Sequence, residues 1–356
     1  MSKLFEPVTF RSVTARNRIT VSPMCQYVAT EGLGDDWHVQ HLGAHAFGGA
    51  GIVFTEATHV AAVARITPGC LGLWTDEQQA LATRLAALIT RAGAVPGMQI
   101  AHAGRKASSH VPWDGGKPIT PEAGGWVPLG PTETPFYPGA PTPHPLGTDE
   151  LHTIAGQFAA TARRARQAGF RILEIHGAHG YLISSFLSPV SNTRNDGYGG
   201  DLAGRARLLF EVVDAVRSEW PEDLPLFVRL SCTDWMPGGM GIEETVQVAK
   251  WLAATGKVDL IDCSSGGVHT DQKLSVYPGY QVPFAEAVKR GSGLATGAVG
   301  MIIAPEQAEE IIANGRADLA FIARALLAEP SWPLRAARLL GAKPPLAQPY
   351  HRAVLP

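Results

Sequence analysis

Residues 148–181 read TDELHTIAGQFAATARRARQAGFRILEIHGAHGY and contain a clear transition from helix to strand. Thr148-Asp149 is a helix start and Ala168-Gly169 is a helix stop. A short apolar run, Ile172–His176, follows almost at once and leads into glycines and polar residues. A helix that runs directly into a buried strand is typical of a β-α-β unit, so this stretch predicts a parallel sheet.

The same alternation continues along the whole chain. Short apolar runs rich in β-branched residues predict eight strands, at Ile19–Met24, Ile52–Glu56, Pro96–His102, Ile172–His176, Leu226–Ser231, Val258–Cys263, Leu294–Gly297 and Leu319–Ile322. Helical patterns lie between them, near residues 37–47, 76–92, 149–168, 203–218, 243–255, 282–290, 305–313 and 325–340. This repetition favours one α/β domain over residues 1–356, a closed (β/α)8 or TIM barrel. The short, glycine-flanked seventh strand leaves an open doubly wound sheet as the alternative.

Glycine and proline are unusually frequent, with 39 Gly and 27 Pro among 356 residues. Ten of the prolines fall between residues 112 and 145, in the gap between the third strand and its helix. A loop of this length is normally either functional or disordered. Trp113 and Trp126 within it favour an ordered lid or β-excursion. We therefore expect residues 103–147 to form a capping segment after the third strand, and residues 343–356 to form a C-terminal tail.

Charge and composition argue against several classes of partner. Lys plus Arg number 30 and Asp plus Glu number 32, so the formal net charge of −2 offers no basic surface to a nucleic acid. No window approaches the ~20 apolar residues of a membrane span, and Met1–Phe10 lacks the pattern of a signal peptide. The four cysteines, Cys25, Cys70, Cys232 and Cys263, form no Cys-x-x-Cys pair. We expect a cytoplasmic protein with reduced thiols and no nucleic-acid or membrane partner.

Polar residues follow seven of the predicted strands. Because the carboxyl ends of the strands in a parallel barrel meet at one face, we expect these residues to form a single site. Gly297–Gly300 follows the seventh strand, Ala323-Arg324 follows the eighth, and Ser264–Gly267 follows the sixth. Exposed backbone N–H groups beside an arginine favour a phosphate-binding cradle. The alternative is that these glycines only make tight turns.

The pattern His176-x-x-His179, with Tyr181 two residues later, is a second chemical signal. Two neutral imidazoles can donate hydrogen bonds to one substrate oxygen while a tyrosine supplies a proton. A metal-binding pair is a second interpretation. However, the first strand ends in Met24-Cys25 and the fifth carries Arg229, so we expect no metal. Buried structural histidines are a third interpretation.

These segments together carry a family pattern. Its parts are Pro23-Met24-Cys25-Gln26-Tyr27, Gln99 before His102–Lys106, His176–Tyr181, Leu182–Ser188, Ser191–Gly200, and Gly297–Gly300 with Arg324. In this combination the chain resembles the Old Yellow Enzyme family of flavin-dependent ene-reductases. Within that family it is similar to the short "thermophilic-like" bacterial subclass that includes xenobiotic reductases. The resemblance extends from Leu4 to about Tyr350.

The resemblance implies an FMN-dependent oxidoreductase that takes hydride from NADPH or NADH. It would reduce the C=C bond of activated alkenes, namely α,β-unsaturated carbonyl or nitro compounds. His176 and His179 would bind the substrate oxygen, Tyr181 would protonate the α-carbon, and Tyr27 would close the pocket. The residues that would hold the flavin are Pro23, Met24, Cys25, Ala57, Gln99, Arg229, Ser265, Gly266, Gly297, Val299, Gly300, Ala323 and Arg324.

The resemblance also implies a homodimer or a dimer of dimers, in which Arg352 reaches the neighbouring subunit's flavin site. The chain departs from the family pattern directly after this residue, where it reads Ala353-Val354-Leu355-Pro356. A solvated tail is therefore the alternative for Arg352. Outside the family, a flavin-free barrel isomerase or lyase could use the same cradle for the phosphate of a metabolite. A metal-dependent hydrolase and a thiol-based redox sensor are further alternatives.

Overall fold

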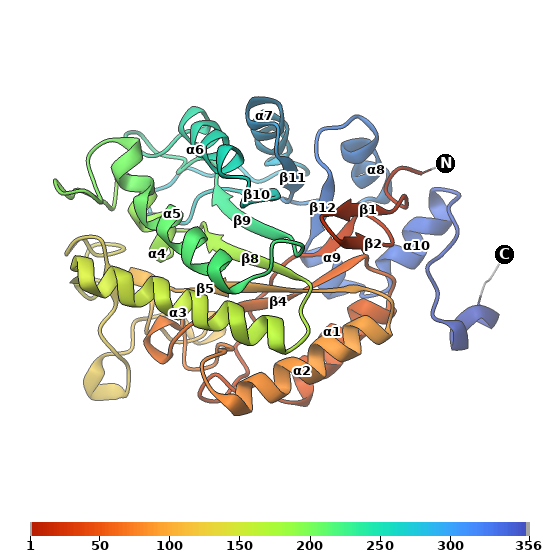
Figure 1. Cartoon of the computed structure of the whole chain (residues 1–356), viewed down its shortest axis with the longest axis horizontal. Helices are drawn as coiled ribbons and strands as arrows, with labels where there is room; N and C mark the ends of the chain where they lie inside the picture. The colour runs from red at the N-terminus through yellow and green to blue at the C-terminus, as the bar shows by residue number, and fades with distance from the viewer. Residues whose placement is uncertain (1, 354–356) are drawn as a thin grey trace.

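The computed structural model describes residues 2–353, and within them parallel strands close into a barrel (Figure 1). Around the barrel the strands are β3 (Ile19–Val21), β4 (Ile52–His59), β5 (Val95–Ala101), β8 (Ile172–Gly177), β9 (Leu226–Ser231), β10 (Leu260–Ser264), β11 (Ala295–Ala298) and β12 (Leu319–Ile322). Strand β12 pairs with β3, which completes the ring. The closed barrel is confirmed, and the open doubly wound sheet is excluded.

Helices alternate with these strands and cover the outside of the barrel (Figure 1). The main ones are α1 (Asp36–Phe47), α2 (Asp76–Arg91), α3 (Thr148–Gln167), α5 (Leu202–Glu219), α6 (Ile242–Thr255), α7 (Val282–Ser292) and α8 (Pro305–Ala313). Side-chain caps fix where several of them begin. Thr75 accepts a hydrogen bond from the backbone N–H of Gln78 at the start of α2, which satisfies a donor that the helix leaves free. No helix within residues 2–353 is long and apolar enough to cross a membrane.

The prediction of one helix near residues 325–340 is wrong, because the segment forms two helices. These are α9 (Arg324–Ala328) and α10 (Trp332–Leu339). Pro330 has no N–H to donate and disfavours helical backbone at the residue before it. Glu329 accordingly leaves the helical region, with φ −144° and ψ 88°.

Two further departures lie next to the site. The first barrel strand ends at Val21, not at Met24 as expected. The extra residues include Pro23, which cannot donate to a strand ladder. A short helix, α4 (Leu182–Leu187), follows the histidine motif and was not expected. It is buried along its whole length, so helical amphipathicity gives no signal there.

Aromatic rings fill the interior of the barrel. Phe54 of β4 lies against Phe227 of β9 and Phe321 of β12, with ring centroids 6.3 and 5.9 Å apart. Two strand glycines provide the space for these rings. A Cβ atom on Gly97 would lie 2.8 Å from the Phe54 ring, and one on Gly297 would lie 2.3 Å from the Phe321 ring. Side chains therefore fill the interior of the barrel as a packed core, and the open end lies above this core.

The proline-rich segment between β5 and α3 is ordered by hydrogen bonds. It contains three short 3₁₀ turns and two parallel two-residue strands, β6 (Leu129–Gly130) and β7 (His144–Pro145). The hydroxyl of Ser108 accepts from the N–H of Trp126 and donates to Ile119. Arg194 donates to two carbonyl oxygens at the far end of the segment. In Figure 1 the segment (yellow) lies at one end of the barrel.

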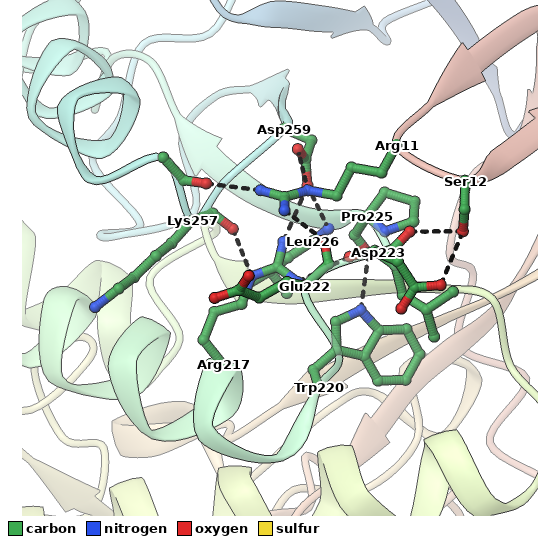
Figure 2. Close-up of polar contacts among 12 residues, drawn as sticks. Arg11, Ser12, Arg217, Trp220, Glu222, Asp223, Pro225, Leu226, Lys257 and Asp259 are labelled. Atoms are coloured by element: carbon green, nitrogen blue, oxygen red, sulfur yellow. Dashed lines mark hydrogen bonds and ion pairs between the residues drawn. The ribbon is translucent and has the colours of Figure 1, made fainter.

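The opposite end of the barrel carries an N-terminal hairpin, β1 (Val8–Phe10) and β2 (Val13–Ala15). Figure 2 shows how a polar network fastens it to the loops before β9 and β10. The carboxylate of Asp259 accepts from Arg11 at 2.6 Å, from Arg217 at 3.0 Å and from the N–H of Leu226 at 2.9 Å. One carboxylate thus joins the hairpin, helix α5 and two barrel strands.

This network predicts that Asp259→Ala destabilises the fold. The change leaves the buried guanidinium of Arg217 without its anion, and we expect a loss of about 2–3 kcal/mol. The measurement is the shift in thermal unfolding temperature at pH 7. Asp214→Ala is the matched control, because Asp214 pairs with Lys257 at the surface and should matter by ~0.5 kcal/mol or less. Equal shifts in the two variants would contradict this role of Asp259.

Candidate active site

A cavity of about 390 Å³ opens at the carboxyl end of the strands. Five of the predicted flavin residues line it, namely Arg229, Val299, Gly300, Ala323 and Arg324. Its other walls are Ser264, Tyr280, Gln281, Met301, Ile302, Ile303, Phe321, Ala325 and Ala328. This size is within the range of small-molecule sites, and two arginines among mostly apolar walls favour an anionic ligand with a large apolar part.

Eight residues predicted to bind flavin do not line this cavity, and three of them belong to the sixth and seventh barrel strands or follow them. Ser265 bonds to the side chain of Gln281, and the N–H of Gly266 donates to a backbone carbonyl. Gly297 lies beneath the Phe321 ring. These three residues therefore support the strand ends through contacts within the protein and do not line the cavity. Gly300 is different, because its φ of +119° and its close approach to Gln281 and Tyr280 leave no room for a Cβ atom.

The remaining predicted flavin residues come from the first three barrel strands. Pro23, Met24 and Cys25 follow β3 and are partly exposed. Ala57 of β4 and Gln99 of β5 are direct partners in the sheet. Desolvation raises the pKa of the Cys25 thiol well above its usual range, and the neighbouring Cys70 and Glu56 raise it further. Cys25 is thus an uncharged thiol, which argues against a thiolate-based redox sensor.

His176, His179 and Tyr181 form a compact cluster at the end of β8. The His176 ring centroid lies 5.1 Å from that of His179 and 5.0 Å from that of Tyr181, both edge to face. Burial lowers the pKa of both histidines well below the usual range, and the nearby Arg229 lowers them further. Burial also raises the pKa of the Tyr181 phenol. Both imidazoles are therefore neutral and the phenol is protonated at physiological pH.

Each histidine uses one ring nitrogen within the protein. Nδ1 of His176 accepts from the N–H of Ala178 at 3.2 Å, so its proton is on Nε2. Nε2 of His179 lies 2.7 Å from the hydroxyl of Ser264. The other ring nitrogens, Nε2 of His176 and Nδ1 of His179, make no hydrogen bond within residues 2–353.

Residues 2–353 contain no group of three or more His, Cys, Asp or Glu that could hold a metal ion.

Aromatic and cationic side chains surround this cluster. Tyr27 packs edge to face with Trp113 of the proline-rich segment, with ring centroids 5.9 Å apart. Lys106 places its ammonium 5.0 Å from the centroid of Tyr181 and 4.5 Å from that of Phe136. The proline-rich segment therefore contributes side chains next to the predicted substrate residues.

Comparison with known proteins identifies the family. Residues 3–342 match the model of the NADH:flavin oxidoreductase / NADH oxidase family. The chain belongs to the Old Yellow Enzyme family.

Relatives of known sequence and structure agree with this assignment. The chain is 46% identical over 351 residues to an NADPH dehydrogenase of Geobacillus sp. (strain WCH70), covering 98% of each chain. It is 43% identical over 355 residues to an NADPH dehydrogenase of Listeria innocua serovar 6a, covering 99% of each chain. Morphinone reductase in complex with tetrahydroNAD is 25% identical with a TM-score of 0.76, covering 97% of this chain and 92% of that one. Like other Old Yellow Enzymes, this protein is an FMN-dependent NAD(P)H oxidoreductase.

The cavity suits FMN by its own chemistry. Arg324 lies at its mouth, exposed and without an ion pair among the described residues, where a dianionic phosphate would need a cation. Gly300 keeps the backbone open beside it. The apolar walls, including Ile302 and Phe321, suit a flat ring system. Arg229, Gln99 and the residues after β3 would then hold the ring edge. The flavin-dependent interpretation therefore holds, and the flavin-free isomerase or lyase is not supported.

Two buried carboxyl groups that sequence reasoning missed lie beneath this site. Asp262 of β10 pairs with Arg229 at 2.9 Å, and Glu174 of β8 accepts from the side-chain amide of Gln99 at 2.7 Å. Burial and the nearby Asp262 raise the pKa of Glu174 to about 8. Burial also raises the pKa of Asp262, but the adjacent Arg229 partly offsets this rise. The charges balance when Asp262 is ionised against Arg229 and Glu174 is protonated. The signal that could have revealed them in the sequence is a carboxyl residue within an otherwise apolar strand.

Sequence reasoning also missed the residues that hold His179. Its backbone has φ +61°, which is unusual for a residue with a side chain. Its N–H donates to the hydroxyl of Ser231 at 2.9 Å, and its carbonyl accepts from Lys106 at 2.9 Å. Lys106 and Ser231 are polar residues at strand ends, but nothing in the pattern shows which backbone groups they bind.

Arg352 is exposed and is not among the residues that line the cavity of this chain. The described segment after α10 lies on the same side of the barrel as the N-terminal hairpin (Figure 1). Tyr350, two residues earlier, lines a surface hollow with residues of α1 and α2. The tail was expected over residues 343–356, of which residues 354–356 lie outside the described residues.

The protonated state of Glu174 predicts how stability changes with pH. Because its pKa is near 8 in the folded chain and near 4.5 in the unfolded chain, folding takes up a proton between these values. Stability contributed by this group therefore falls as pH rises through that range and levels off above about 8. Glu174→Gln keeps an acceptor for Gln99 but does not titrate. The unfolding temperature of this variant should decline less than that of wild type between pH 6 and 8.

The control is the exposed Glu77 on α2. Glu77→Gln should follow the wild-type profile across the same pH range. A Glu174→Gln profile as steep as that of wild type would show that Glu174 is already ionised at pH 6.

Proposed function

We propose that this enzyme reduces the C=C bond of α,β-unsaturated carbonyl or nitro compounds. The observation that carries the proposal is the arrangement of His176, His179 and Tyr181. Two neutral imidazole rings each keep one nitrogen free of partners among the described residues, and a protonated phenol stands beside them. Ser264, which contacts His179, also lines the cavity that suits FMN. The cluster therefore lies at the edge of the flavin site.

The two histidines bind the activating oxygen of the substrate. A carbonyl or nitro oxygen accepts from Nε2–H of His176 and Nδ1–H of His179. These bonds strengthen as negative charge develops on that oxygen when the β-carbon receives a hydride, so they favour the transition state over the ground state. Neutral donors suit this role because they require no proton release.

Tyr181 supplies the proton at the α-carbon. Its pKa is raised by burial, so the phenol remains protonated throughout the physiological range. A weak acid is sufficient here because the carbon it protonates is strongly basic. The ammonium of Lys106 lies over the Tyr181 ring, and the charge of Arg229 stabilises the phenolate left after transfer.

FMN held in this cavity would supply the hydride, with NADPH or NADH as the reductant. Arg229 faces the cavity and is paired with Asp262, so the protein presents there a cation whose charge is partly balanced. Gln99 keeps its side-chain oxygen and a second N–H for the ring edge, since one N–H goes to Glu174. The relatives named NADPH dehydrogenase support NADPH as the reductant.

The proline-rich segment, residues 103–147, acts as a lid over the substrate side of the site. Trp113 packs on Tyr27, and Phe136 lies against Lys106 beside Tyr181. The protein works as a homodimer or a dimer of dimers, with Arg352 directed towards the flavin site of a second copy. The exposure of Arg352 and its absence from the lining of this chain's own cavity support that role.

Replacing the proton donor tests the mechanism. Tyr181→Phe should slow the step with an alkene such as cyclohexenone by roughly a hundredfold or more. The step with NADPH should remain nearly unchanged, because no proton from Tyr181 is needed there. Stopped-flow absorbance of the flavin separates the two half-reactions. Equal losses in both would contradict the role of Tyr181.

Removing the oxygen-binding donors tests the site. A phenol presents one oxygen to the two histidines as the substrate does. His176→Ala combined with His179→Ala should weaken phenol binding at least tenfold, which corresponds to about 1.4 kcal/mol. The measurement is titration of FMN-loaded enzyme with 4-hydroxybenzaldehyde. If affinity is unchanged, these histidines do not bind the substrate oxygen.

A further inference from the structure

Two serines in register hold one histidine of the site. Ser231 ends β9, Ser264 ends β10, and the two are direct partners in the sheet. Ser231 accepts from the backbone N–H of His179 at 2.9 Å, while Ser264 lies 2.7 Å from Nε2 of its ring. One serine therefore fixes the backbone of His179 and the other contacts its side chain. We propose that Ser264 donates its hydroxyl hydrogen to Nε2 of His179 and thereby places the imidazole proton on Nδ1.

The hydrogen-bond partners of the two hydroxyls determine the direction of this bond. Ser231 donates to the carbonyl of Gly266 at 2.9 Å, so its oxygen is free to accept from His179. For Ser264, the ring nitrogen of His179 is the only partner that its hydroxyl has within residues 2–353. If Nε2 carried the proton, the ring would donate to Ser264 and the hydroxyl hydrogen would have no acceptor among these residues. Donation from Ser264 satisfies both groups.

The charges around His179 support a neutral ring with one proton. Arg229 and Lys106 both lie near it, and together with burial they lower its pKa well below the usual range. A neutral imidazole carries hydrogen on one nitrogen only. With Nε2 accepting from Ser264, the proton must be on Nδ1, the nitrogen that has no partner within the described part of the chain. Ser264 is thus a positioning residue that acts through His179.

The consequence for the site is a matched pair of donors. The backbone N–H of Ala178 sets the proton of His176 on Nε2, and Ser264 sets that of His179 on Nδ1. Without Ser264, His179 can carry its proton on Nε2 and present a lone pair to the substrate oxygen. In that arrangement the lone pair of His179 repels the substrate oxygen, where an N–H group would attract it. This consequence rests on the proposed function, whereas the position of the proton does not.

The experiment measures the proton position directly and compares Ser264→Ala with Ser264→Thr. The protein is the FMN-loaded enzyme with ¹⁵N-labelled histidine, and long-range ¹H–¹⁵N NMR reports which ring nitrogen carries hydrogen. His179→Gln assigns the resonances. We expect Nδ1–H in wild type and in Ser264→Thr, which keeps the hydroxyl. Ser264→Ala should move the proton, wholly or in part, to Nε2.

Phenol affinity is the second readout. Ser264→Ala should weaken 4-hydroxybenzaldehyde binding about tenfold, with Ser264→Thr close to wild type. Flavin content and unfolding temperature, measured on each variant, confirm that it is folded and loaded. Nε2–H in wild type, or unchanged Nδ1–H in Ser264→Ala, would overturn the proposal. A shifted proton with unchanged phenol affinity would instead uphold the role of Ser264 and contradict the proposed substrate site.

Discussion

The closure of eight parallel strands into a ring is the constraint on which the rest of this structure depends. Because all strands run the same way, their carboxyl ends meet at one face, and residues far apart in sequence become neighbours there. Gln99, His176, Arg229 and Ser264 come from four strands and stand around one site. Closure also fixes the register, and register decides which side chains share a layer. The pairing of Ser231 with Ser264 is one result.

Closure of the barrel also buries ionisable side chains in its interior. Arg229 cannot line the cavity at the strand ends without desolvation, and Asp262 on the neighbouring strand supplies the anion that makes this possible. A second carboxyl group, Glu174, then cannot ionise easily near the charge of Asp262, and it remains a neutral partner for Gln99. Arg229 is thus part of a balanced group of four residues. Its influence on a bound ligand is smaller than that of an isolated arginine.

The sequence predicted the barrel well because strand and helix periods are local properties. It located the ends of most elements to within a few residues. It failed where the local residue pattern carries no signal for the structure. Helix α4 is buried on all sides and shows no amphipathic pattern. Pro330 divides the last predicted helix, and this division could have been predicted from the proline alone. Motifs identified His176, His179 and Tyr181, whereas the hydrogen bonds of Ser264, Ser231 and Lys106 depend on tertiary register that no single segment encodes.

The site shows how backbone geometry and proton placement combine. His179 adopts φ +61°, a conformation that its side chain disfavours, and Ser231 and Lys106 hold it from both sides. Gly180 and Gly267 approach so closely that a Cβ atom on Gly180 would lie 2.2 Å from the carbonyl oxygen of Gly267. The strained turn brings both imidazoles to the same side as Tyr181. Ser231 and Lys106 thus fix the backbone of His179, whereas Ser264 contacts its ring at Nε2. In the proposed mechanism, different groups therefore set the position of this residue and the position of its proton.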